Sequence, residues 1–186
     1  MHFPHLFWGE VNLKECAMHS LFLYFVNAVT SVNKFFFRLA SLFIFIIVFS
    51  MTYEVISRYI FQAPTTWGLE LATLLFGPYF LLGGAFLLHL KGHVNLDIVK
   101  NSLPKRIQKS LEVFAYVVIV IFCIILFKYA YPAAIESFNY KETTFSAWNP
   151  PIWPTKFIIP LSLVLLGLQS VAELIRLFIQ PEEEVV

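Results

Sequence analysis

The stretch EVISRYIFQAPTTWGLELATLLFGPYFLLGGAFLLHLKGHVNLD, residues 54–97, decides the fold of this 186-residue chain. Its central part, residues 67–90, is apolar and long enough to cross a bilayer, because the hydrocarbon core of a membrane needs about 20 residues in helical form. Charged and histidine side chains cluster near both ends of this segment. Such side chains at the ends of a span are costly unless they reach lipid headgroups or find partners. The first half of the chain is therefore expected to be built around specific polar contacts.

The composition of the whole chain argues against a water-soluble globular protein. Hydrophobic residues make up 59% of it, and only 13% of the residues are charged, whereas soluble domains keep about a quarter of their residues charged. The net charge of +1 gives no reason to expect nucleic acid as a partner. The two cysteines, Cys16 and Cys123, are too few and too far apart for a disulfide framework or a metal site, so we interpret both as ordinary small residues.

Four apolar segments are long enough to span a lipid bilayer, which predicts an all-α integral membrane protein. The predicted transmembrane helices are residues 35–61, 67–90, 111–131 and 153–179. Residues 18–33 are apolar but dotted with polar side chains, and they form either a helix lying in the membrane interface or an early extension of the first span. We favour the interfacial helix. The chain is thus expected to be one membrane domain over residues 1–186, with an N-terminal segment at 1–34 and an acidic tail at 180–186.

The distribution of lysine and arginine predicts the orientation of the four spans. The loop after the second span carries the largest group of basic residues, which are Lys91, Lys100, Lys105, Arg106 and Lys109. Short loops rich in these residues stay in the cytoplasm, so with four spans both termini are expected to be cytoplasmic as well. Trp67, Trp148 and Trp153 mark the opposite boundary, because tryptophan rings favour the level of the headgroups.

Three charged residues near the predicted outer hairpin are candidates for specific contacts. Glu54 and Arg58 lie four residues apart and therefore on one face of a helix. They form either a headgroup-level ion pair of little energetic weight or a buried contact. Glu70 lies in the first turn of the second span, where the helix dipole favours an acid. Because the connection between the two helices is short, Glu70 is also placed to contact Arg58.

Two histidines and three glycines of the second span and its exit form a second group of candidates. His89 and His93 are one helical turn apart, a spacing that can bind zinc or haem. The other histidines all precede the first span, so no metal or haem site is expected. Gly77, Gly83 and Gly84 let helix backbones approach closely in lipid. These glycines serve either loose packing within the helix bundle or the docking of another membrane protein.

Motifs of catalysis and of solute transport are missing from the sequence. There is no glycine-rich phosphate loop, no Gly-x-Ser-x-Gly and no His-Glu-x-x-His, so an enzyme is not expected. The third span is wholly apolar from 113 to 127, and no internal repeat is visible, whereas solute and ion pathways leave polar residues or broken helices within the membrane. The chain alone is therefore not expected to be a pump or carrier, and no cofactor or solute-binding residue is predicted.

Five short pieces of the sequence carry a family resemblance through their order and spacing. They are VISRYIF at 55–61, WGLEL at 67–71, LGGA at 82–85, GHVNLD at 92–97 and LP at 103–104. Together they resemble the small membrane subunit, the DctQ or Q subunit, of tripartite ATP-independent periplasmic (TRAP) transporters over about residues 27–180. The segment WNPPIWPTK at 148–156 resembles one branch of that family.

The resemblance implies a role in transport. TRAP systems import carboxylate-bearing solutes by symport with sodium: a soluble periplasmic binding protein captures the solute, and a large membrane subunit carries it. The small subunit packs against the large one and braces it in the bacterial inner membrane. Competing interpretations are a standalone small carrier and a haem-binding membrane subunit that uses His89 or His93.

The resemblance also implies structural roles for particular residues. Its motifs carry Arg58, Trp67, Glu70, His93 and Asp97, which are expected to stabilise the subunit and its assembly. The remaining predicted structural or interface residues are Glu54, Gly83 and Gly84. None of these residues is expected to bind solute.

Overall fold

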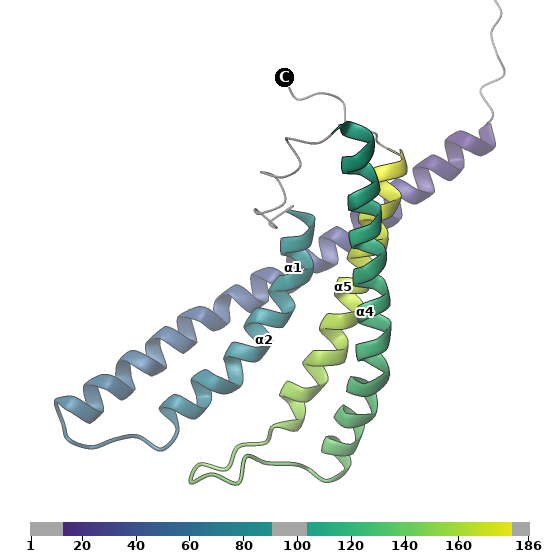
Figure 1. Cartoon of the computed structure of the whole chain (residues 1–186). Helices are drawn as coiled ribbons and strands as arrows, with labels where there is room; N and C mark the ends of the chain where they lie inside the picture. Colours follow the sequence, from purple (N-terminus) through teal and green to yellow (C-terminus); the bar gives the residue numbers. More distant parts are fainter. Residues whose placement is uncertain (1–12, 91–103, 180–186) are drawn as a thin grey trace, which may run out of the picture.

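The computed structural model describes residues 13–90 and 104–179, which contain four long helices (Figure 1). The helices are α1 (Leu13–Tyr59), α2 (Gly68–His89), α4 (Lys105–Asn139) and α5 (Trp153–Ile179). Each is long and apolar enough to cross a membrane. Within the described residues, the only β-type pairing is an isolated bridge between Thr143 and Pro151. The prediction of an all-α protein with four candidate spans is confirmed.

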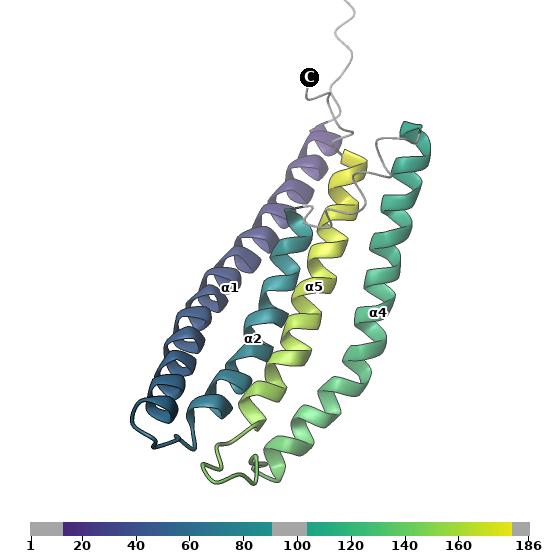
Figure 2. The same ribbon diagram turned by 60° about the vertical axis from the view of Figure 1, so that its left-hand side comes forward.

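The helices form two hairpins that meet through α5. α1 packs against α2, α4 packs against α5, and α5 also packs against both α2 and α1. Figure 2 shows the order α1, α2, α5, α4 across the molecule. The two central helices are accordingly more buried. In the apolar 18-residue stretch that qualifies each helix as a candidate span, 39% of α2 and 44% of α5 are buried inside the protein, against 11% of α1 and 6% of α4. Broad apolar faces of α1 and α4 therefore point away from the protein.

Small residues bring the three helices α1, α2 and α5 together. The buried core cluster is made of Ala40, Leu82, Ala85 and Leu165. Partly buried apolar side chains packed around it are Phe36, Ile158 and Leu166. Because lipid tails are as apolar as these side chains, the helices associate through close packing and polar contacts rather than through the hydrophobic effect. The core thus positions the polar residues that lie at either end of it.

Two helices extend further than the predicted spans. α1 includes residues 18–33 in one continuous helix with the first span, and α4 runs from Lys105 to Asn139, beyond both ends of the predicted span 111–131. The apolar stretch Phe22–Tyr59 of α1 corresponds to about 57 Å of helix, nearly twice the ~30 Å hydrocarbon core. Apolarity reports which residues suit lipid, whereas a helix ends only where its backbone hydrogen bonding is interrupted. By contrast, α2 and α5 begin and end within a residue of the predicted bounds.

Candidate functional site

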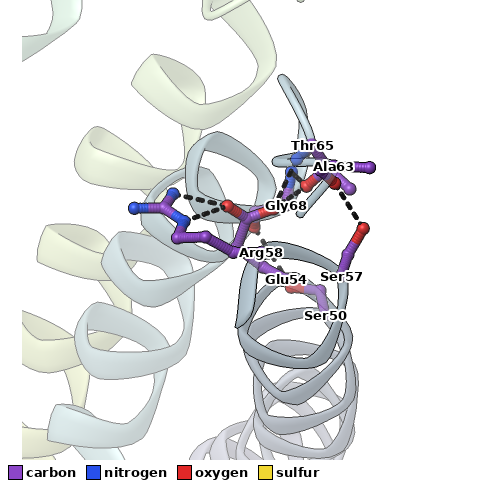
Figure 3. Close-up of polar contacts among 7 residues, drawn as sticks. All are labelled: Ser50, Glu54, Ser57, Arg58, Ala63, Thr65 and Gly68. Carbon is purple, nitrogen blue, oxygen red and sulfur yellow. Dashed lines mark hydrogen bonds and ion pairs between the residues drawn. The ribbon is translucent and has the colours of Figure 1, made fainter. Parts of the chain in front are cut away.

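A cluster of polar side chains closes the hairpin between α1 and α2 (Figure 3). We call it the hairpin cluster, and it consists of Ser50, Glu54, Ser57, Arg58 and Thr65. Glu54 is at its centre and only 4% exposed. One carboxylate oxygen accepts hydrogen bonds from Nε of Arg58 at 3.0 Å and from its Nη2 at 2.5 Å. The other oxygen accepts from the backbone N–H of Thr65 at 2.9 Å and from the Thr65 hydroxyl.

Further hydrogen bonds of the hairpin cluster fix the connecting backbone. The Ser57 hydroxyl donates to the carbonyl of Ala63 at 2.5 Å, and the Ser50 hydroxyl donates to the carbonyl of Gly68 at 3.3 Å. The Thr65 hydroxyl accepts from the N–H of Gly68 at 3.3 Å, which satisfies one of the free donors at the start of α2. Every one of these partners lies within 18 residues of the other in sequence. The result is a connection held to α1 along its whole length.

Gly68 allows α2 to start directly against α1. A Cβ atom at this position would lie 2.8 Å from Oγ1 of Thr65 and 3.0 Å from Cβ of Glu54. Contacts this short would force Thr65 and Glu54 to shift, so a residue larger than glycine would disturb the close approach of the two helices. No role was predicted from the sequence for Thr65, Ser50, Ser57 or Gly68, although Ser57 and Gly68 lie within the family motifs. The Thr-x-x-Gly spacing before an apolar run, which resembles a helix start, is the signal that could have found Thr65 and Gly68.

Trp67 and Glu70, at the start of α2, contact residues outside the hairpin cluster. The Trp67 ring stacks on Tyr53 of α1, with centroids 5.6 Å apart. Glu70 accepts a hydrogen bond from the Ser146 hydroxyl at 2.7 Å, which ties α2 to the loop between α4 and α5. The predicted contact between Glu70 and Arg58 is not formed among the described residues, because the guanidinium is already bound by Glu54 one turn earlier on its own helix.

A second polar cluster lies at the other end of α2 and joins three helices. We call it the three-helix cluster; its members are Thr30 and Asn33 of α1, His89 of α2, and Gln169 and Glu173 of α5. Asn33 donates to the side-chain carbonyl of Gln169 at 2.7 Å and to the backbone carbonyl of Leu165 at 3.5 Å. Gln169 donates to Glu173 at 2.9 Å and to Thr30 at 3.4 Å. Nδ1 of His89 lies 2.5 Å from the same carboxylate oxygen of Glu173.

The three-helix cluster is the most deeply buried polar group in the described part of the chain. Asn33 and Gln169 are 0% exposed, and Glu173 is buried as well. Oδ1 of Asn33 has no hydrogen-bond partner there. Asn33, Gln169 and Glu173 were not predicted from the sequence as members of a polar site. The signal that could have found the last two is their spacing of four residues within an otherwise apolar segment, which puts both on one helix face.

Among the predicted histidine and glycine candidates, His89 and Gly83 contact other helices of the protein, whereas Gly77 and Gly84 do not. His89 is bound to Glu173, and no group of three or more metal-ligating side chains is assembled within residues 13–90 and 104–179. His93 and Asp97 lie outside the described residues. A Cβ atom at Gly83 would touch Phe37 of α1 at 3.9 Å, whereas at Gly77 and Gly84 it would meet nothing within 4 Å. Gly83 therefore serves packing inside the protein, while Gly77 and Gly84 face outward.

The α4–α5 loop, residues 140–152, is a third ordered polar region. The backbone of Ile152 donates to the carbonyl of Glu142 at 3.0 Å, and that of Thr144 donates to the carbonyl of Pro150 at 3.1 Å. Nζ of Lys156 lies 2.5 Å from the Glu142 carboxylate. The hydrogen bond from Lys156 holds the pKa of Glu142 below its ordinary value. The loop is thus pinned at its base to the start of α5.

The arrangement defines a multi-pass helical membrane protein whose polar side chains in the described region bind one another across helices. The chain belongs to the DctQ component of the tripartite ATP-independent periplasmic transporters, whose family model matches residues 47–180. A relative is SiaT of Haemophilus influenzae (strain 86-028NP), a sialic acid TRAP transporter permease protein, which is 34% identical over 74 residues. The match covers 40% of this chain and 12% of the length of that relative. The resemblance inferred from the short motifs is confirmed, and the chain is a small subunit of a TRAP transporter.

Proposed function

We propose that this chain scaffolds the large membrane subunit of a TRAP transporter during sodium-driven import of carboxylate-bearing solutes, which a periplasmic binding protein delivers. The family match carries the proposal. The relative SiaT is named for sialic acid, an acidic solute, which supports a carboxylate-bearing cargo. In the bacterial inner membrane, the basic residues after α2 favour a topology with both termini in the cytoplasm. The hairpin cluster and the α4–α5 loop then lie on the periplasmic side.

The internal contacts support a bracing role rather than a solute pathway. Glu54 and Glu173, the buried carboxylates of α1 and α5, are bound by side chains of this same chain. A carrier needs polar groups that are free to bind and release a solute or an ion within the membrane. A brace instead needs helices locked to each other, which is what contacts linking α1, α2 and α5 provide.

The outward face of α2 at Gly77 and Gly84 is our proposed contact with the large subunit. Small residues at a membrane-helix surface allow another helix to approach closely, and neither glycine is used for packing inside this chain. Glu54, Arg58, Trp67, Glu70 and Gly83 hold the helices that present this face. The predicted roles of His93 and Asp97 in assembly belong to the same proposal.

Co-purification of a tagged chain with the large subunit tests the scaffold role. Gly84→Leu is expected to lower the yield of the complex at least tenfold while leaving the chain folded, because the new side chain points outward. Ala133→Leu, which enlarges another exposed small residue on α4, is the matched control and should retain the complex. Sodium-dependent uptake by vesicles that contain this chain alone would contradict the proposal, as would an unchanged complex in Gly84→Leu.

A further inference from the structure

The α4–α5 loop presents one aromatic side chain in a backbone conformation that aromatic residues rarely adopt. Phe145 has a φ of 54° and is 87% exposed. A single exposed aromatic residue is ordinary. A bulky residue in the left-handed region is an outlier, however, and its conformational strain persists only where the surrounding structure imposes it. The combination of strain with nearly complete exposure calls for an explanation outside the chain.

The other positive φ values in the described residues have local explanations. Lys141 follows the end of α4 in a Schellman motif, in which the N–H of Glu142 donates to Ser137 and that of Lys141 donates to Phe138. Asn149 is of a residue type that tolerates this region. Gln62 lies in the turn after α1, where its side chain donates to the carbonyl of Tyr59. Phe145 follows no helix end and is of a residue type that rarely adopts this region, and hydrogen bonds of its own loop hold it there.

A chain of hydrogen bonds holds the Phe145 backbone in place and connects it to α2. The N–H of Phe145 donates to Oδ1 of Asn149 at 3.0 Å, and the N–H of Asn149 donates to the Ser146 hydroxyl at 2.9 Å. Ser146 in turn donates to Glu70 of α2 at 2.7 Å. The loop is therefore anchored to both helical hairpins. This anchoring fixes the direction in which the ring points.

The setting of the ring favours a protein pocket over the bilayer as its binding partner. The loop lies beyond the ends of α4 and α5 in both views (Figures 1 and 2). The residues next to the ring in sequence, Thr143, Thr144 and Ser146, are polar, and the nearest aromatic residues of the loop, Tyr140 and Trp148, are three or more residues away. A fluid bilayer accepts a ring in any orientation, whereas a shaped pocket binds more tightly when the ring is held in the bound orientation beforehand.

We propose that Phe145 is an anchor that inserts into an apolar pocket of a water-soluble protein on the outer side of the membrane. Aromatic anchors buried in pockets carry much of the binding energy of protein interfaces. The inference rests on the proposed function, which places the loop on the periplasmic side and provides a soluble partner, the solute-binding protein of the same transporter. Strain at Phe145 is then the consequence of presenting its ring in the orientation that the pocket requires.

Site-specific photo-crosslinking in the assembled transporter distinguishes a protein pocket from the bilayer. The photoreactive amino acid p-benzoylphenylalanine is placed at position 145, and at position 122 of α4 as a control, where the natural Phe122 is also exposed. Position 145 is expected to crosslink to the solute-loaded binding protein, and position 122 is not. Crosslinks from position 145 to lipid alone would overturn the proposal.

The variant Phe145→Gly removes the ring while keeping the backbone conformation of the loop. Glycine adopts a positive φ without strain, so the chain is expected to stay folded and to retain the large subunit. The apparent KM of uptake for the loaded binding protein should rise about tenfold or more, and Phe145→Trp should restore most of it. An unchanged KM in Phe145→Gly with an intact complex would overturn the anchor alone. Failure of the unmodified chain to co-purify with the large subunit would instead contradict the proposed function.

Discussion

The hairpin cluster and the three-helix cluster stabilise the same molecule by different means. In the hairpin cluster, Glu54 is bound by Arg58 four residues away and by Thr65 eleven residues away, so the cluster shapes a single hairpin. In the three-helix cluster, Glu173 and Gln169 reach partners 84 to 139 residues away, and α5 is thereby fixed to α1 and α2. The first cluster determines how one connection folds, and the second determines how the two hairpins fit together.

The two clusters also differ in their access to solvent. The Arg58 side chain is half exposed, so water can replace part of what Glu54 provides. Asn33 and Gln169 are fully buried. A buried polar group that loses its partner cannot form a replacement hydrogen bond with water. We therefore expect substitutions in the three-helix cluster to have the larger effect on stability.

Asn33→Ala should give the largest loss of stability among the variants considered. It removes both hydrogen bonds that Asn33 donates and leaves the carbonyl of Gln169 without a donor in a buried site. The free energy of unfolding is expected to fall by about 2–3 kcal/mol. Circular dichroism during denaturation in detergent micelles measures it. Asn27→Ala on the same helix, where the side chain is exposed, should stay within about 0.5 kcal/mol of the unmodified protein; equal losses in both variants would remove the distinction between the clusters.

Gly68→Ala tests the hairpin cluster, and the expected effect is smaller. The added Cβ would lie too close to Thr65 and Glu54, and such overpacking costs about 1–3 kcal/mol. The same unfolding measurement applies. Gly84→Ala is the matched control, because its Cβ meets nothing within 4 Å and alanine favours the helix by up to about 1 kcal/mol. A Gly68→Ala protein as stable as Gly84→Ala would mean that α1 and α2 are not held as closely as described.

The hairpin cluster is more predictable from the sequence than the three-helix cluster for a physical reason. A spacing of four residues on a helix brings Glu54 and Arg58 together whatever the tertiary structure is, so their pairing follows from the sequence. The pairing of Asn33 with Gln169 depends on how α1 and α5 pack, which no local pattern contains. The same limit explains the predicted contact of Glu70 with Arg58: Glu70 instead bonds Ser146, 76 residues further along the chain.

The extent of the helices shows a similar division. Hydropathy located all four candidate spans, and it gave the ends of α2 and α5 because turn residues follow their apolar segments closely. The helices α1 and α4 continue beyond the predicted spans, at the start of α1 and at both ends of α4. The backbone of α4 ends at the Schellman motif around Lys141, a feature that depends on backbone geometry and not on hydropathy.

Double-mutant cycles compare one contact from each end of α2. The coupling free energy between His89 and Glu173, measured with their alanine variants, is expected to be about 1–2 kcal/mol, since Glu173 is buried. The exposed hydrogen bond between Ser146 and Glu70 should give about 0.5 kcal/mol or less. Unfolding in detergent provides all the values. Equal coupling free energies for the two pairs would show that burial does not determine how strongly the contacts at the two ends of α2 stabilise the protein.

The smallest expected effect is a pH dependence that belongs to the α4–α5 loop. The hydrogen bond from Lys156 lowers the pKa of Glu142 in the folded state below its ordinary value of 4.5. A depressed folded-state pKa contributes stability that is present above the unfolded-state pKa and is lost as the pH falls through the folded-state pKa. The unmodified protein should therefore be more stable than Glu142→Gln at pH 7, and the difference should shrink as the pH is lowered below about 4.5. Thermal unfolding of both proteins across this range measures the difference; one that grows toward acid pH would show that the ion pair with Lys156 does not stabilise the folded loop.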